Sequence, residues 1–234
     1  MEPVVSYRLE SSVATITMDD GKVNALSLRV LSELNRALDQ ALADRAVVVL
    51  TGRRGVFSAG FDLPVLRARG DDAVALLRAG FEMAERLLAF PAPVVIACSG
   101  HAIAMGVFLV LSGDYRIGTT GAFKLTANEV AIGMTMPRAA IEICRQRLTP
   151  AHLLRAIALA EPYTPDDAVA AGFLDRVVPA AELAGTARDI AGMLTALDRN
   201  AHTASKLRLR GPMLESLRRA NEADLAEFQE RRGI

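Results

Sequence analysis

Two short apolar runs constrain the fold of this chain more than any other feature of its sequence. Residues 46–50 read Ala-Val-Val-Val-Leu and residues 94–98 read Val-Val-Ile-Ala-Cys, with no charged side chain in either run. Runs of this length and composition are typical of strands that are buried on both faces of a parallel sheet. Residues 72–88, between them, have the apolar spacing of a helix with one buried face. This strand–helix–strand order predicts an α/β fold.

The segments around these runs predict further elements in the first half of the chain. Residues 13–18 alternate β-branched and other side chains, which predicts a half-buried strand that pairs with residues 4–9 across a short turn. Ser27 is placed to cap a helix whose apolar positions begin at Val30. Residues 51–60 are predicted to be a Gly-rich loop, and residues 99–106 a turn of small residues that leads into a buried helix.

The pattern changes to helix near residue 135. Short strands are predicted over residues 115–117 and 122–125, and the chain is helical almost throughout after that. Predicted helix starts are Pro137, at the first helical position, then Pro150, Thr164 with Asp167 three residues later, and Pro212. We therefore expect an α/β core to about residue 135, followed by a helical region.

Composition excludes several classes of protein. Lys+Arg and Asp+Glu both total 27, so the chain has no basic excess of the kind that nucleic-acid binders show. The longest uncharged apolar stretch, residues 102–111, is half the length of a membrane span, and the first residues do not read as a secretory signal. Cys98 and Cys144 lie in apolar runs, which predicts buried free thiols in a reducing compartment. We expect a cytoplasmic protein that binds neither nucleic acid nor membrane.

Two junctions between strand and loop carry the candidate chemistry. Serine-hydrolase and phosphate-loop motifs are absent, and His101, His152 and His202 share no metal-ligand spacing, so no metal site is predicted. Residues 57–63 and 99–106 each follow an apolar run, at the strand ends where open α/β sheets bind ligands. Their small residues let a ligand approach the backbone, and two converging N–H groups there would form an oxyanion hole. The alternative is that both segments are ordinary turns.

Five blocks of sequence, in order along nearly the whole chain, carry a resemblance to a known family. They are Lys-Val-Asn-Ala-Leu at 22–26, Phe-Ser-Ala-Gly-Phe-Asp-Leu at 57–63, residues 93–117 ending in Gly-Asp-Tyr-Arg-Ile, Asn-Glu-Val-Ala-Ile-Gly at 128–133, and residues 168–179. Together and with matching spacing they resemble the crotonase, or enoyl-CoA hydratase/isomerase, superfamily.

The resemblance implies a fold, a substrate and an assembly. The family fold is a spiral of repeated ββα units, here residues 1–190, followed by a C-terminal helical trimerisation region, here residues 191–234, within a single functional domain. The substrate is an acyl-CoA thioester, so coenzyme A enters as part of the substrate and no separate cofactor is expected. A homotrimer or a dimer of trimers is implied. Lys22, Arg53 and Arg54 are candidates for the CoA phosphates, although most charged loop residues are simply solvated.

The resemblance also assigns site residues by their position in the blocks. The oxyanion donors are the backbone N–H groups of Phe61 and Met105. Family members usually have glycine in place of Met105, so the acyl preference is left open. The substrate-binding positions are Ala25, Ala59, Gly60, Asp62, Leu63, Gly106 and Phe108.

The acid–base pattern distinguishes the reactions within this family. Family hydratases use two glutamates to hold and activate water; one position matches Glu129, and the other is Phe108. A double-bond shift needs only one base. Residues 114–117 and 123–129 also resemble the mitochondrial-type 3,2-enoyl-CoA isomerases.

The resemblance therefore implies isomerisation of 3-enoyl-CoA to 2-enoyl-CoA in fatty-acid metabolism, with Glu129 as sole base. The alternatives are an enoyl-CoA hydratase, a non-catalytic acyl-CoA binding protein, or another crotonase-type reaction such as thioester hydrolysis or decarboxylation. For Glu129 the structural alternative is a carboxylate at a helix start, and for Phe108 it is plain core packing, which is compatible with a place beside the acyl pocket.

Overall fold

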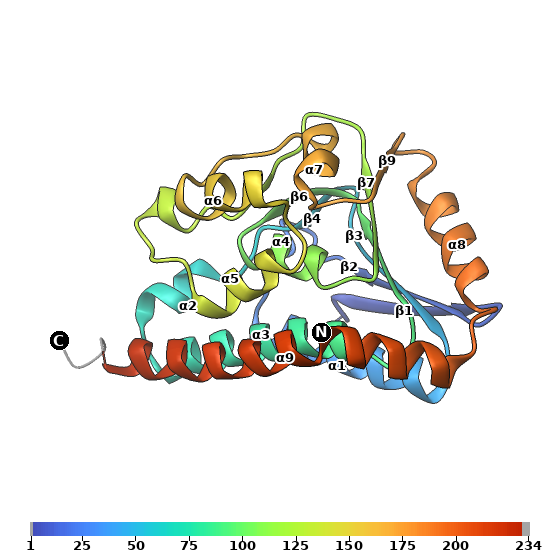
Figure 1. Cartoon of the computed structure of the whole chain (residues 1–234), viewed down its shortest axis with the longest axis horizontal. Coiled ribbons are helices and arrows are strands. Elements are labelled where there is room, and N and C mark those ends of the chain that lie inside the picture. The colour runs from blue at the N-terminus through green and yellow to red at the C-terminus, as the bar shows by residue number, and fades with distance from the viewer. Residues whose placement is uncertain (1, 231–234) are drawn as a thin grey trace.

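A six-stranded sheet, built from strands spread over most of the chain, organises the fold (Figure 1). The computed structural model describes residues 2–230. In spatial order the strands are β1 (Val5–Glu10), β2 (Val13–Met18), β3 (Val47–Gly52), β5 (Val94–Cys98), β7 (Tyr115–Thr119) and β9 (Arg176–Val178). β1 pairs antiparallel with β2, and the other neighbouring strands are parallel. The predicted α/β class and the predicted hairpin are confirmed.

Both faces of this sheet are covered, which explains the continuous apolar runs. Val48 and Leu50 belong to the large core, together with side chains of α1 (Leu28–Ala43) and α3 (Asp71–Ala89). Val47 and Val49 belong to a second cluster with side chains of α8 (Leu183–Leu194). Successive strand residues point to opposite faces, so a strand between two helix layers needs apolar residues at every position.

A second, smaller sheet lies mostly where the sequence predicts a loop and a turn, and its third strand overlaps the end of the strand predicted over residues 122–125. It contains the parallel strands β4 (Gly55–Ser58), β6 (Gly100–Ile103) and β8 (Leu125–Thr126). The loop predicted over 51–60 and the turn predicted over 99–106 are therefore wrong in part. These strands are only two to four residues long, and they form by pairing with segments far along the chain. The succession of a long strand, a short strand and a helix is the predicted ββα spiral.

Helices of the spiral and of the C-terminal region complete the fold. Their bounds are α2 (Leu63–Ala68), α4 (Met105–Leu111), the short 3-10 helix η1 (Val130–Ile132), α5 (Arg138–Arg145), α6 (Pro150–Ala158), α7 (Pro165–Ala171) and α9 (Arg199–Glu230). The predicted cap at Thr164 is confirmed, because its Oγ1 accepts the N–H of Asp167 at 3.2 Å. None of the described helices is long and apolar enough to cross a bilayer.

Three details of the C-terminal half differ from the prediction. Pro137 is the N-cap of α5 rather than its first residue. Strand β9 interrupts the predicted run of helices and completes the large sheet beside β7. Pro212 does not start a helix but lies inside α9. The boundary expected at residue 190 falls within α8, and residues 231–234 of the expected C-terminal region lie outside the described residues.

Helix α9 continues through Pro212 because packing and buried charges hold it on both sides of the proline. Before it, Lys206 Nζ lies 2.7 Å and Arg210 Nη1 lies 2.9 Å from the carboxylate of Asp114. After it, Leu214 is 4% exposed within the large core. A proline inside a helix removes one hydrogen bond, and these contacts offset that loss.

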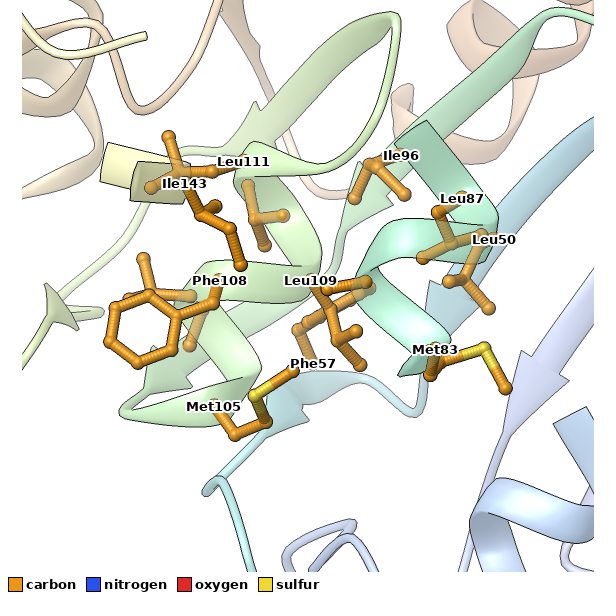
Figure 2. Packing of buried hydrophobic residues seen from close by; sticks show 14 of the residues in the cluster. Leu50, Phe57, Met83, Leu87, Ile96, Met105, Phe108, Leu109, Leu111 and Ile143 are labelled. Atoms are coloured by element: carbon orange, nitrogen blue, oxygen red, sulfur yellow. The ribbon is translucent and has the colours of Figure 1, made fainter. Parts of the chain in front are cut away.

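Helix α4 passes through the middle of the large core. All seven of its residues are buried. In Figure 2, Phe108 projects towards Ile143 of α5, whereas Leu109 lies on the side towards Leu87 of α3. The predicted buried thiols are confirmed, because Cys98 and Cys144 are free and buried.

Candidate active site

The first predicted oxyanion donor, the backbone N–H of Phe61, lies just beyond strand β4. The chain is held on both sides of it: Gly60 O accepts the N–H of Leu26 at 2.8 Å, and Leu26 O accepts the N–H of Asp62 at 3.1 Å. The N–H of Phe61 has no acceptor among the described residues. The backbone at Phe61 is therefore fixed, with its own N–H free for a ligand.

The second predicted donor, the N–H of Met105, lies at the first residue of α4. Ala104 precedes it with φ 50° and ψ −126°, and the N–H of Ala104 donates to Thr126 O at 2.9 Å. The N–H of Met105 has no acceptor in the described part of the chain. The side chain of Met105 is 1% exposed and packs in the core, so the backbone N–H is the group that Met105 offers to a ligand.

Gly60 brings the two donor segments into contact. A Cβ built on Gly60 would lie 2.8 Å from Ile103 O and 3.2 Å from Met105 N, and the φ of Gly60 is +85°. A side chain here would strain the backbone and collide with the turn before α4, so this approach requires glycine. Two N–H groups from separate loops thus lie beside one another, an arrangement that can hold an oxygen that gains negative charge.

Glu129 lies on the segment that follows β8. Because β8 pairs with β6, in the register Ile103 to Thr126, this segment runs beside the turn that carries Met105. Glu129 is 6% exposed, and its Oε2 has no hydrogen-bond partner among the described residues. Burial raises the pKa of Glu129 to about 7, against a smaller lowering by its own backbone N–H. A carboxyl group with this pKa can both take and return a proton near neutral pH.

Helices α4 and α5 differ in what they bring to the region of this carboxylate. Phe108 is 1% exposed, and helix α4 carries no acidic residue that could act as a second base. Burial and the nearby carboxylate of Glu129 both raise the pKa of Cys144, which puts Glu129 close to helix α5. Among the described residues Glu129 is the one acidic residue that is buried, and desolvation of its charged form accounts for the raised pKa.

The remaining predicted positions lie on or next to the two segments that carry the predicted donors. Gly106 packs so closely that a Cβ on it would lie 2.5 Å from Ser58 O. Ala59 is tied to Val23, whose O accepts the Ala59 N–H at 3.0 Å. Asp62 caps α2 and Leu63 is the first residue of that helix, whereas Ala25 lies directly before the Leu26 that bridges to Phe61.

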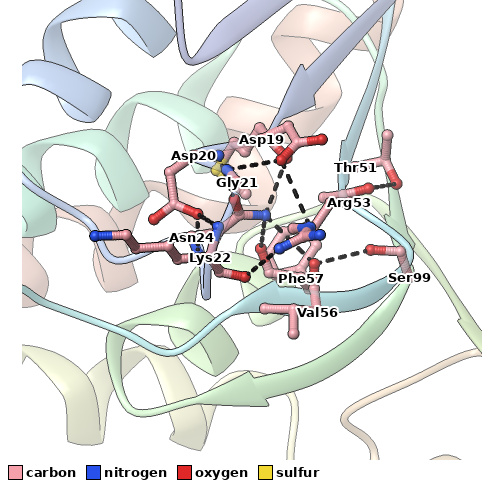
Figure 3. A network of polar contacts seen from close by, with 12 residues as sticks. Asp19, Asp20, Gly21, Lys22, Asn24, Thr51, Arg53, Val56, Phe57 and Ser99 are labelled. Carbon is pink, nitrogen blue, oxygen red and sulfur yellow. Dashed lines mark hydrogen bonds and ion pairs between the residues drawn. The ribbon is translucent and has the colours of Figure 1, made fainter.

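The block at residues 22–26 has a structural role that its sequence does not reveal. Asn24 is 1% exposed, and its side-chain amide donates to Met18 O at 2.9 Å and to Phe57 O at 3.1 Å. Its Oδ1 accepts the N–H of Asp20 at 3.0 Å. Asn24 therefore joins β2 to β4, as the network in Figure 3 shows, and holds the loop ahead of Phe61 in place.

The three basic residues near this loop differ in what they contact. Arg53 donates to Lys22 O at 2.6 Å and lies 3.5 Å from the carboxylate of Asp19, so it holds the loop together (Figure 3). Lys22 and Arg54 are exposed. The side chains of Lys22 and Arg54 are therefore the more accessible cations for a ligand phosphate.

Two polar atoms beside Glu129 were not expected from the sequence. Thr126 Oγ1 and Asn128 Oδ1 are buried without a hydrogen-bond partner among the described residues. Their residue types are common in loops, and only their burial in the fold distinguishes them. His101 makes a structural contact, since its Nδ1 accepts the N–H of Lys124 at 3.1 Å.

Comparison with known proteins identifies the family. The family "Enoyl-CoA hydratase/isomerase" matches residues 8–232. A probable enoyl-CoA hydratase of Bacillus subtilis is 29% identical over 73% of this chain and 67% of its own length. The mitochondrial enoyl-CoA delta isomerase 1 of Rattus norvegicus is 27% identical over 94% of this chain and 78% of its own.

The solved structures agree with this result. An enoyl-CoA hydratase/isomerase family protein of Pseudomonas syringae is 46% identical, with a TM-score of 0.94 over 96% of this chain and 98% of that one. The printed names of the relatives include both hydratases and isomerases, so they establish the class of enzyme and not the individual reaction. The chain belongs to the enoyl-CoA hydratase/isomerase family, the crotonase superfamily of enzymes that its sequence motifs predict.

Proposed function

We propose that this enzyme moves the double bond of a 3-enoyl-CoA to give the 2-enoyl-CoA. Glu129 takes a proton from carbon 2, the bonding electrons shift towards the thioester, and the N–H groups of Phe61 and Met105 hold the enolate oxygen. Glu129 then returns the proton to carbon 4, which leaves the double bond between carbons 2 and 3. Oxyanion donors of this kind contribute about 3–4 kcal/mol each to transition-state stabilisation.

The observation that carries this proposal is that Glu129 is the one buried carboxylate among the described residues. Glu129 is desolvated, with a pKa raised to about 7, and the buried ring of Phe108 stands on α4 where the resemblance predicts the second carboxylate of a hydratase. A shuttle that accepts and returns one proton needs one group with a pKa near the working pH. Water addition needs, in addition, a group that holds the water in place, and an apolar ring cannot do this.

Hydration of 2-enoyl-CoA is the second candidate. It is favoured by the Bacillus subtilis relative, which is named a probable hydratase, and by the unpartnered Oε2 of Glu129, which could hold a water molecule without help. A non-catalytic acyl-CoA binding protein is the third candidate. It requires that no enoyl-CoA is turned over and that Glu129→Gln leaves ligand binding unchanged.

The proposal extends to partners and location. Neither reaction needs a cofactor beyond the coenzyme A of the substrate, and exposed Lys22 is a candidate for its phosphates. Assembly as a homotrimer or a dimer of trimers is supported by large apolar side chains left exposed, with Leu154 68% and Leu209 82% exposed. Two buried free thiols support a reducing compartment such as the cytoplasm.

The test uses separate assays with 3-enoyl-CoA and 2-enoyl-CoA, for the wild type and Glu129→Gln. Double-bond migration that disappears in the variant supports the isomerase. Hydration of the 2-enoyl substrate with little migration overturns it in favour of the hydratase. Binding of CoA esters without turnover of either substrate overturns both and supports the binder.

A further inference from the structure

The oxyanion-donor position of this enzyme carries a large ring. Phe61 is half-buried, and its backbone is held by the hydrogen bonds between Leu26 and both neighbours of Phe61, Gly60 and Asp62. The backbone therefore has little freedom to move, and the ring needs a place that leaves the space in front of its own N–H open.

Helix α3 supplies that place at Gly80. A Cβ built on Gly80 would lie 2.2 Å from Cε1 and 2.3 Å from Cζ of Phe61, so the ring occupies the space that any other residue would fill. On the next residue, the ring of Phe81 meets that of Phe61 edge to face, with centroids 6.3 Å apart and planes at 72°. Gly80 is buried in the middle of α3, where glycine is unfavourable compared with alanine. The steric contact with Phe61 is a reason for glycine at a position where helix propensity opposes it.

We propose that Gly80 is a positioning residue for the oxyanion site, because it forms the notch in α3 that holds the Phe61 ring away from the thioester. A methyl group at residue 80 expels the ring tip. If the backbone stays in place, the ring turns towards its exposed side and crowds the N–H of Phe61. If the backbone yields instead, the ring displaces that N–H. Either change weakens the contact with the thioester oxygen. The inference rests on the proposed function in one respect, since it uses the oxyanion role of Phe61.

The test is Gly80→Ala, with Gly185→Ala as the matched control. Gly185 also lies inside a helix, α8, but a Cβ on it has no neighbour within 4 Å. We expect Gly80→Ala to lower kcat/KM for 3-enoyl-CoA by about ten-fold or more, because small displacements of a positioned group are costly. Gly185→Ala should leave kcat/KM and the circular-dichroism spectrum unchanged.

A double-mutant cycle with Phe61→Leu separates the notch from a general effect on α3. Leucine retains the backbone N–H but lacks the ring tip that enters the notch, so Gly80→Ala should cost much less in the Phe61→Leu background than in the wild type. An equal loss in both backgrounds, or no loss in the wild-type background, overturns the proposal. If Gly80→Ala does not fold, Phe61→Tyr decides: its added hydroxyl lengthens the ring at Cζ, and unchanged kcat/KM in that variant also overturns the proposal.

Binding is measured in parallel so that this proposal and the proposed function can fail separately. Calorimetry with a saturated acyl-CoA gives Kd for all variants without any reaction. A wild type that binds but does not isomerise contradicts the proposed function alone. In that case, weaker binding by Gly80→Ala that is relieved by Phe61→Leu still supports the notch, and equal Kd values for the wild type and Gly80→Ala refute it.

Discussion

Replacement of Glu129 by glutamine should make the folded protein more stable at alkaline pH while it removes activity. Glu129 is 6% exposed, and burial raises its pKa from 4.5 to about 7. A pKa difference of this size between the folded and unfolded states lowers the free energy of unfolding by about 3 kcal/mol once the group is ionised in both states. A buried base that serves catalysis at the expense of stability is a trade-off seen at many active sites.

The direction of this change in stability depends on whether Glu129 ionises first in the folded or in the unfolded state. As pH rises through 4.5, the carboxyl group ionises in the unfolded chain and stays protonated in the folded one, so the wild type begins to lose stability. The loss is complete once pH exceeds about 7, where the folded-state group has also ionised. Glutamine does not titrate, so the stability of Glu129→Gln lacks this dependence.

The measurement is urea unfolding of both proteins from pH 5 to pH 8 at one protein concentration. The stability of Glu129→Gln relative to the wild type should increase by about 2.5 kcal/mol over this range. Effects of glutamine that do not depend on pH cancel in this difference. A relative stability that stays constant within about 0.5 kcal/mol would refute the reasoning from burial.

The same pKa should govern catalysis. Because the base must be ionised to take a proton, kcat/KM of the wild type should rise with pH, with a midpoint near 7, and the variant should lose roughly 10²–10⁴-fold. A midpoint near 4.5 would show that Glu129 is solvated in solution, contrary to the structure.

Three further substitutions test the framework that holds the site. Phe108→Ala should lower the free energy of unfolding by about 3–5 kcal/mol, since Phe108 is 1% exposed in the core. A small loss in urea unfolding would mean that the core collapses around the smaller side chain or that water reaches this position. Asn24→Ala should lower the free energy of unfolding by about 2–3 kcal/mol, because the carbonyls of Met18 in β2 and Phe57 in β4 lose the side-chain amide that binds them. Hydrogen exchange of the β4 amides should become faster, and unchanged protection of these amides would contradict this role. Asp114→Asn should lower the free energy of unfolding, measured by heat or urea, by about 3–5 kcal/mol, because Lys206 and Arg210 keep their buried charges without the carboxylate. An unchanged free energy of unfolding would show that the buried ion pairs make no net contribution to stability.

Segments with a strong local signal could be predicted from sequence. The apolar runs at β3 and β5 match strands with two buried faces, and Ser27 caps α1 through a 3.2 Å hydrogen bond from the N–H of Val30. Thr164 caps α7 in the same way. Hydrophobic periodicity and capping act within a few residues, so the sequence itself carries the information.

Segments without such a signal differ from the prediction. Strands β4 and β6 look like a loop and a turn because they have four residues each and pair with one another across more than 40 residues of chain, and β9 has three residues. Pro212 looks like a helix start because proline is favoured there, but long-range packing carries α9 through it. In each case a tertiary contact outweighs the local preference.

The sequence by itself determined the α/β class and, through five blocks, the family and the candidate positions Phe61, Met105 and Glu129. Only the tertiary structure decided that Gly60 joins the two donor loops, that Glu129 is desolvated, and that Gly80 receives the ring of Phe61. Local pattern depends on neighbours along the chain, which any sequence displays. Desolvation and steric fit depend on atoms from distant segments, and these meet only after the chain has folded.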